Sequence, residues 1–120
     1  MHVDDDPTVT EAVRRILQKL GYNVDSFNSP YCAIDRLRTA PQHFCLVLTD
    51  LIMPGMNGLQ FASAVISICP KMPVVLFSGY TDNYSEDEIS RSGICEILEK
   101  PADIPSLADV IRRAIDRTQT

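Results

Sequence analysis

The spacing of apolar and polar residues along the chain predicts five helices. From Thr8 to Leu20 the apolar side chains fall on one face of a helix with 3.6 residues per turn. Thr8 and Glu11 have the spacing of a capping box at its start, and Asp6 before them is interpreted as a residue that helps to open the helix. The other predicted helices begin at Ser29-Pro30 or span 59–69, 85–92 and 104–117.

Short apolar runs separate these helices and predict strands. The runs at 45–49 and 73–77 are continuous rather than alternating, which is typical of strands that helices cover on both faces of a parallel sheet. Shorter extended stretches are expected at 1–3, 23–27 and 94–98. Strand and helix therefore alternate five times, and this order favours an open, doubly wound α/β sheet.

Composition restricts the class of protein. The 120 residues suit one domain, expected to span 1–120, and 45% hydrophobic residues exclude intrinsic disorder. No apolar run is long enough to cross a membrane, and the first residues do not resemble a signal peptide, so a cytoplasmic protein is expected. The net charge of −5 argues against direct binding of nucleic acid. Three of the four cysteines lie among apolar residues, without any CxxC pair, and are expected to be reduced and buried.

Polar residues follow four of the predicted strands, at the points where these strands end. Asp4 and Asp5 follow the first strand, Asp50 the third, Ser78 the fourth and Lys100 the fifth. The carboxyl ends of parallel strands meet at one edge of an open sheet, and ligands bind beyond that edge. We therefore expect these five side chains to converge on one site.

The chemistry of these residue types points to a metal and a phosphoryl group. Three carboxylates in one place repel one another, and burial raises their pKa values further. Mg²⁺ relieves the repulsion, because it binds one or two carboxylates and commonly a phosphate oxygen. Lys100 adds a positive charge and Ser78 adds a hydroxyl donor. Together these groups predict phosphoryl transfer to a carboxylate.

The motifs around these residues resemble the receiver domain of two-component response regulators (CheY-like) over essentially the whole chain. The D-x-x-M-P-x-M-x-G stretch, followed later by a K-P pair, is specific to that family. The resemblance implies a flavodoxin-like (βα)₅ fold with strand order 2-1-3-4-5 and, in this chain, a shortened first strand. The matching segments are Val3-Asp4-Asp5-Asp6-Pro7, Thr49-Asp50-Leu51-Ile52-Met53-Pro54-Gly55-Met56-Asn57-Gly58, Phe77-Ser78-Gly79-Tyr80 and Glu99-Lys100-Pro101.

The resemblance also implies a role for each acidic residue. Asp50 becomes the phosphoacceptor. Asp5, Asp50 and the backbone carbonyl of Ile52 become the ligands of Mg²⁺, while Asp4 acts mostly through water. The side chains of Ile52 and Tyr80 are bulky, and we expect them to restrict access of water to the phosphoryl group.

The resemblance gives expected roles to four further positions, one in the acidic site and three in the conformational response of the family. Lys100 becomes the cation of the site, and the bond between Lys100 and Pro101 is expected to be cis. Ser78 becomes the switch hydroxyl, with Gly79 after it as a hinge. Ile97 stands where many receiver domains carry Tyr or Phe, so the aromatic part of the familiar switch is expected to be missing.

The implied function is a phosphoacceptor in a two-component phosphorelay rather than an independent enzyme. The partners are a sensor histidine kinase or a histidine phosphotransfer domain, and the chain is expected to assist its own phosphorylation and dephosphorylation. The surface formed by 85–92, 94–98 and 104–117 is expected to change its affinity for a partner, including a second copy of the domain as a homodimer. The stretch Phe-Ser-Gly-Tyr-Thr-Asp favours a receiver from a hybrid sensor histidine kinase, with a stand-alone regulator as the alternative.

Two other functions stay open from the sequence. A dehalogenase-like phosphatase needs a second acid two residues after its nucleophile, where this chain has Ile52, and it needs a larger core. A degenerate receiver that acts only as a protein-interaction module would lack part of the acidic site, whereas all five positions are filled here.

Overall fold

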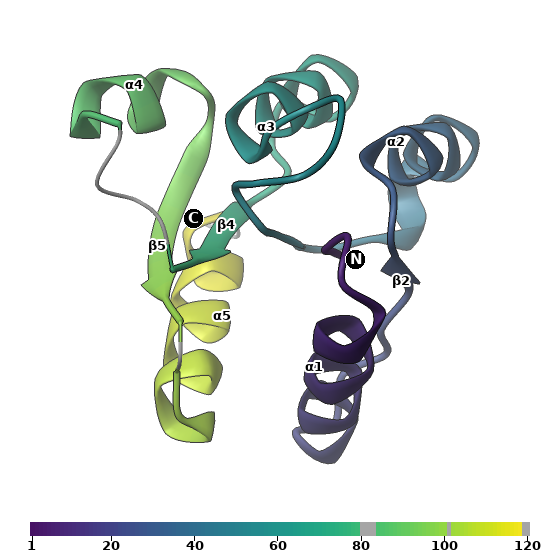
Figure 1. Ribbon diagram of the computed structural model, residues 1–120, viewed down its shortest axis with the longest axis vertical. Coiled ribbons are helices and arrows are strands. Elements are labelled where there is room, and N and C mark those ends of the chain that lie inside the picture. Colours follow the sequence, from purple (N-terminus) through teal and green to yellow (C-terminus); the bar gives the residue numbers. More distant parts are fainter. Residues whose placement is uncertain (80–83, 101, 119–120) are drawn as a thin grey trace.

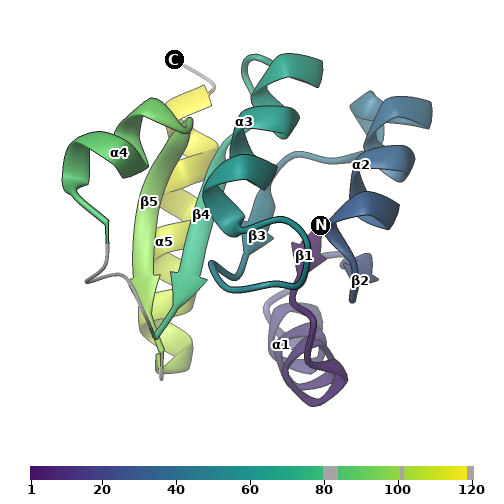
Figure 2. The same cartoon turned by 45° about the horizontal axis from the view of Figure 1, so that its top comes forward.

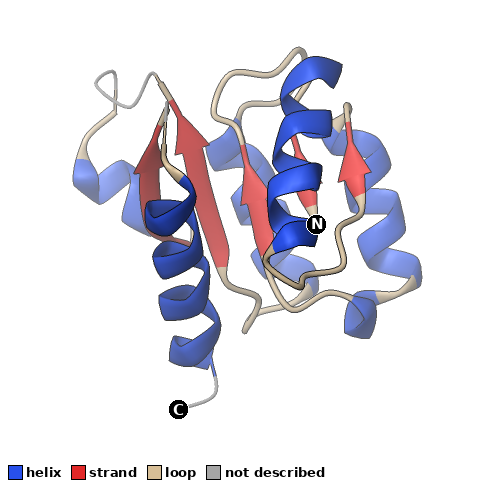
Figure 3. Cartoon of the chain, turned by 90° about the horizontal axis from the view of Figure 1, so that it is seen from below, coloured by secondary structure: helices blue, strands red, loops and turns tan. Residues whose placement is uncertain are grey.

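The five predicted strands form one parallel sheet in a computed structural model that describes residues 1–79, 84–100 and 102–118. The strand order is β2-β1-β3-β4-β5, which confirms the predicted α/β fold and its topology. Figure 3 shows the strands side by side between the helices. Their bounds are β1 His2–Val3, β2 Ser26–Phe27, β3 Val47–Thr49, β4 Val74–Ser78 and β5 Ile94–Glu99.

In the described part of the chain, four α-helices connect these strands, a fifth follows β5, and together they cover both faces of the sheet. Helices α1 and α5 lie on one side, and α2, α3 and α4 lie on the other (Figures 1 and 2). A short 3₁₀ turn, η1 (Pro41–His43), leads from α2 towards β3. The helix bounds are α1 Pro7–Lys19, α2 Pro30–Thr39, α3 Gly58–Ile68, α4 Glu86–Arg91 and α5 Ile104–Thr118.

Two apolar layers hold the helices against the sheet. Val47 and Leu48 are neighbours in β3, yet both are buried, one in each layer. Val47 packs with Phe61 and the rest of the layer under α2 and α3, whereas Leu48 packs with Leu17 of α1 and Ile111 of α5. A strand buried on both faces needs apolar residues at consecutive positions, which is why the run at 45–49 does not alternate.

Two predictions about single residues are wrong. The start of α1 is capped by Asp6, whose Oδ1 accepts a hydrogen bond from the Thr8 amide at 2.9 Å, so Thr8 and Glu11 do not form a capping box. Glu11 instead forms an ion pair with Arg14 at 2.6 Å. The cysteines carry free thiols as expected, but none is buried: two are exposed and two are half-buried, namely Cys32, Cys45, Cys69 and Cys95.

Some predictions concern residues outside the described ranges. These are the side chain of Tyr80 and the bond between Lys100 and Pro101. Among the helices in the part of the chain that the structure describes, none has the length and apolar character needed to cross a membrane.

Candidate functional site

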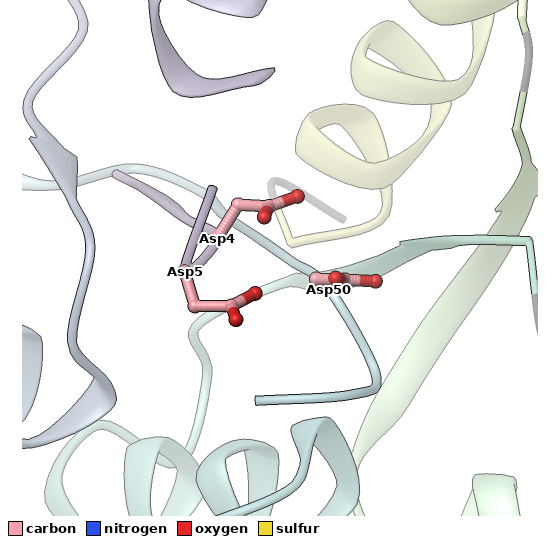
Figure 4. Close-up of side chains that lie close together, drawn as sticks. All are labelled: Asp4, Asp5 and Asp50. Carbon is pink, nitrogen blue, oxygen red and sulfur yellow. The ribbon is translucent and has the colours of Figure 1, made fainter. Parts of the chain in front are cut away.

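Three carboxylates meet beyond the carboxyl ends of β1 and β3. Asp4 and Asp5 lie in the loop between β1 and α1, and Asp50 directly follows β3 (Figure 4). One oxygen from each of the three lies within 4.8 Å of the others. The parallel pairing of Val3 with Thr49 brings the two strand ends side by side. The predicted convergence of the acids is therefore present.

Lys100 connects the last strand to this acidic group. Its ammonium lies 2.8 Å from Oδ2 of Asp4 and 3.7 Å from Oδ1 of Asp50. The other oxygen of Asp4 accepts a hydrogen bond from the Asp6 amide at 2.9 Å. The ammonium also lies 5.3 Å from the centre of the Phe77 ring, within the range of a cation–π contact. Asp4 is thus a buried carboxylate with a partner at each oxygen.

Asp50 is partly buried, and its surroundings shift the pKa of its carboxyl. Its Oδ1 accepts a hydrogen bond from the Leu51 amide at 2.8 Å. Burial raises the pKa of the Asp50 carboxyl, and the nearby charge of Lys100 opposes this without cancelling it. The site places three carboxylates beside one ammonium. This donor set of closely spaced carboxylates fits a hard divalent cation such as Mg²⁺.

The chain needs glycine at two positions after β3, one in the loop and one at the first residue of α3. Gly55 has a φ of +82°, a conformation that favours glycine. A Cβ at Gly58 would overlap the carbonyl oxygen of Asp50, while the Gly58 amide donates to the Leu51 carbonyl at 2.7 Å. The side chain of Ile52, in the same loop, is 54% exposed. The glycines thus explain why the motif after Asp50 has its particular spacing.

Ser78 and Ile97 differ in their relation to the acids. Ser78 is the last residue of β4 and is fully buried, and its hydroxyl forms one of the smaller interactions that lower the pKa of Asp50. Ile97 pairs with Leu76 in the middle of β5, and 39% of it is exposed. Ser78 is therefore part of the site, whereas Ile97 lies apart from it.

Two residues that the sequence analysis did not select contact the acidic loops. The Asn28 amide donates to the Asp4 carbonyl at 2.9 Å, and the Tyr31 hydroxyl donates to the Gly55 carbonyl at 3.0 Å. Neither residue lies in a recognisable motif. The only sequence signal is that Asn28 follows β2, at the same edge of the sheet as the acids.

Comparison with known proteins gives one consistent result. The family model described as "Response regulator receiver domain" matches residues 1–112. The two-component response regulator ARR10 of Arabidopsis thaliana is 27% identical over 98% of this chain, which spans 21% of ARR10. The transcriptional regulatory protein ZraR of Escherichia coli is 30% identical over 98% of the chain, which spans 26% of ZraR. The response regulator receiver protein CpdR of Brucella abortus is 27% identical, with 93% of this chain and 92% of CpdR covered.

Solved structures agree in fold. A response regulator receiver domain protein from Clostridium thermocellum superposes with a TM-score of 0.91 at 24% identity, over 98% of this chain and 94% of that one. The chemotaxis protein CheY4 of Vibrio cholerae superposes with a TM-score of 0.86 at 26% identity, over 94% of each chain.

Proposed function

The chain belongs to the response regulator receiver domain family, and on this premise we propose that Asp50 accepts a phosphoryl group from a phosphohistidine. The donor would be a sensor histidine kinase or a histidine phosphotransfer domain. The observation that carries the proposal is the position of Asp50, partly buried beside two further carboxylates and the Lys100 ammonium.

The contacts favour Asp50 over Asp4 as the nucleophile. Asp4 is bonded at both oxygens, to Asp6 and Lys100, and only 2% of its side chain is exposed. Asp50 accepts a backbone hydrogen bond at Oδ1, and 14% of its side chain is exposed. In the reaction an oxygen of Asp50 forms a bond to phosphorus as the bond from phosphorus to the histidine nitrogen breaks. Lys100, within 3.7 Å, would offset negative charge on the transferred group.

The same carboxylates would hold Mg²⁺. Asp5, Asp50 and the backbone carbonyl of Ile52 are the proposed ligands, and Asp4 acts through water. Bound Mg²⁺ would supply positive charge next to the phosphoryl oxygens. The spacing of the three acids supports a cation at this position, because closely spaced carboxylates repel one another until a cation binds.

Phosphorylation would then act on the segment after β4. A phosphoryl group on Asp50 offers an acceptor to the Ser78 hydroxyl, so Ser78 and Gly79 would move towards it. A Cβ at Gly79 would meet no atom within 4 Å, so this position has room to move. Ile97 has no ring to reorient, and the change would reach the α4-β5-α5 surface through residues 79–92. That surface would then change its affinity for a partner or for a second copy of the domain.

Incubation with acetyl phosphate, with and without Mg²⁺, tests the proposed function. The chain should acquire one phosphoryl group, and do so faster with Mg²⁺. An unmodified chain would contradict the proposal and favour a protein-interaction module. Continuous turnover of added phosphate esters would instead favour a phosphatase, although the exposed apolar side chain of Ile52 occupies the position where such an enzyme needs its second acid.

A further inference from the structure

One short segment contacts both loops that carry the acidic residues. It consists of residues 28–31, between the end of β2 and the first turn of α2. Asn28 Nδ2 donates to the carbonyl of Asp4, and the Tyr31 hydroxyl donates to the carbonyl of Gly55. The first acceptor lies in the loop after β1, and the second lies in the loop after β3. Both loops are therefore tied to the same helix start.

The Asn28 side chain extends the pairing of β1 with β2 beyond the strands. The Asp4 amide donates to the Phe27 carbonyl at 3.1 Å, and Asn28 returns a hydrogen bond to the Asp4 carbonyl at 2.9 Å. Asn28 Nδ2 also donates to the Thr10 hydroxyl at 3.2 Å, which itself donates to the Pro7 carbonyl at 3.0 Å. Asn28 thus holds the loop of Asp4 and Asp5 both at its start and through helix α1.

The Tyr31 side chain holds the loop after Asp50 at its far end. The base of this loop is closed by the hydrogen bond from the Gly58 amide to the Leu51 carbonyl. The tip is held by Tyr31, whose hydroxyl would lie only 2.9 Å from a Cβ at Gly55. The hydrogen bond of this half-exposed tyrosine joins the tip of the loop to α2. The backbone of Ile52 lies between these two anchor points.

The contacts of Asn28 and Tyr31 bear on metal binding because the two loops carry three closely spaced carboxylates. Like charges within 4.8 Å repel one another, and the single ammonium of Lys100 offsets only part of the repulsion between the two loops. The segment 28–31 is a common support that opposes this repulsion, because it bonds to a backbone carbonyl in each loop. Outer contacts of this kind orient metal ligands and commonly change metal affinity.

We infer that Asn28 and Tyr31 are positioning residues that set the separation of the Asp5 and Asp50 loops and thereby the affinity for Mg²⁺. The inference rests on the proposed magnesium site. Neither side chain binds the ion; each acts through a loop carbonyl. A hydrogen bond of this type changes an equilibrium severalfold, so each single substitution should raise the Kd for Mg²⁺ by roughly threefold to tenfold.

The test is a calorimetric titration of the whole chain with MgCl₂, combined with thermal unfolding in EDTA. The variants are Asn28→Ala, Tyr31→Phe and the double variant. Asn23→Ala and Tyr22→Phe are matched controls, since these residues lie between α1 and β2, outside both acidic loops. The expected result is a raised Kd for both single variants, a larger increase for the double variant and no change for the controls.

Three results would contradict the inference. Variants that bind Mg²⁺ as the wild type does would overturn it, even if their unfolding temperature in EDTA were lower, because Asn28 and Tyr31 would then be merely structural. Controls that lose as much affinity as the variants would overturn it as well. A wild-type chain that fails to bind Mg²⁺ would overturn the proposed metal site itself, and this result is distinct from the first two.

Discussion

The ammonium of Lys100 lies 2.8 Å from Oδ2 of Asp4 and joins the end of the last strand to the first loop of the chain. The side chain of Asp4 is 2% exposed, so Lys100 is the counterion that allows this carboxylate to be buried. The same ammonium is 3.7 Å from Asp50. A small movement of the Lys100 side chain would therefore bring its positive charge from Asp4 to Asp50, the proposed phosphoacceptor.

Lys100→Met should destabilise the metal-free chain, because it leaves Asp4 buried without its counterion. The lysine side chain is 26% exposed, so we expect a loss of about 2 kcal/mol in the free energy of unfolding, below the cost for a fully buried pair. Urea denaturation in EDTA measures this loss. Lys71→Met, at an exposed position, is the control. Equal stability of the two variants would show that the pair with Asp4 has no structural role.

Asp5→Ala should weaken Mg²⁺ binding by roughly tenfold or more, since it removes a proposed ligand. In EDTA its unfolding temperature should equal or exceed that of the wild type, because one of three repelling carboxylates is gone. Calorimetric titration and thermal unfolding give the two values. Asp35→Ala, on the exposed side of α2, should change neither. Normal labelling of Asp5→Ala at low Mg²⁺ would contradict the assignment.

His2 should make the chain sensitive to acid. Both of its ring nitrogens are buried without a hydrogen-bond partner among the described residues, and burial lowers its pKa from 6.5 to about 4. The unfolded chain therefore binds a proton that the folded chain excludes between these pH values. Above pH 6.5 neutral His2 does not lower the free energy of unfolding. As the pH falls towards 4, the free energy of unfolding decreases by about 3 kcal/mol in total.

Urea denaturation at several pH values between 7.5 and 4.5 measures this effect. His2→Leu should show a shallower loss of stability with falling pH than the wild type, because the proton-binding group is absent. His43→Gln is the control, since His43 is the other histidine and is exposed. A parallel pH dependence for wild type and His2→Leu would rule out this role of His2.

Ser78 should carry the response to phosphorylation. In NMR spectra of the beryllofluoride adduct, which mimics the phosphoryl group, we expect chemical-shift changes at Ser78, at Gly79 and through residues 84–92. Ser78→Ala should reduce the changes in 84–92, because the methyl group offers no donor to the new acceptor. Changes confined to the loop after Asp50, or an unaltered response in Ser78→Ala, would contradict this route.

The fold was predictable because the chain's local patterns agree with its tertiary structure. Val47 and Leu48 are consecutive apolar residues, and the structure buries them on opposite faces of the sheet.

The cap of helix α1 was harder to predict, because Asp6 and Thr8 are both residues that cap helices well. Asp6 takes this role with an extended backbone before Pro7, and the proline at the first helical position was the usable signal. Exposure of Cys32 depends on which face of α2 meets the sheet.

The acids of the site were predictable for a topological reason, since each follows a strand whose end lies at the same edge. The contacts of Asn28 with Asp4 and of Tyr31 with Gly55 were not. In each pair a side chain meets a backbone carbonyl 24 positions away, and no residue pattern encodes such a meeting. It depends on how α2 lies against two loops, which only the assembled fold determines.

Transfer of radiolabelled phosphate from a phosphorylated histidine kinase to the wild type, Asp50→Asn and Asp35→Asn tests the central claim most directly. The wild type and Asp35→Asn should be labelled in the presence of Mg²⁺. Asp50→Asn should not, because an amide is not a nucleophile towards phosphorus. Thermal unfolding checks that Asp50→Asn is folded. At neutral pH this variant should be at least as stable as the wild type, because burial disfavours the ionised carboxylate that the substitution removes. Labelling of a folded Asp50→Asn at the wild-type rate would contradict the account.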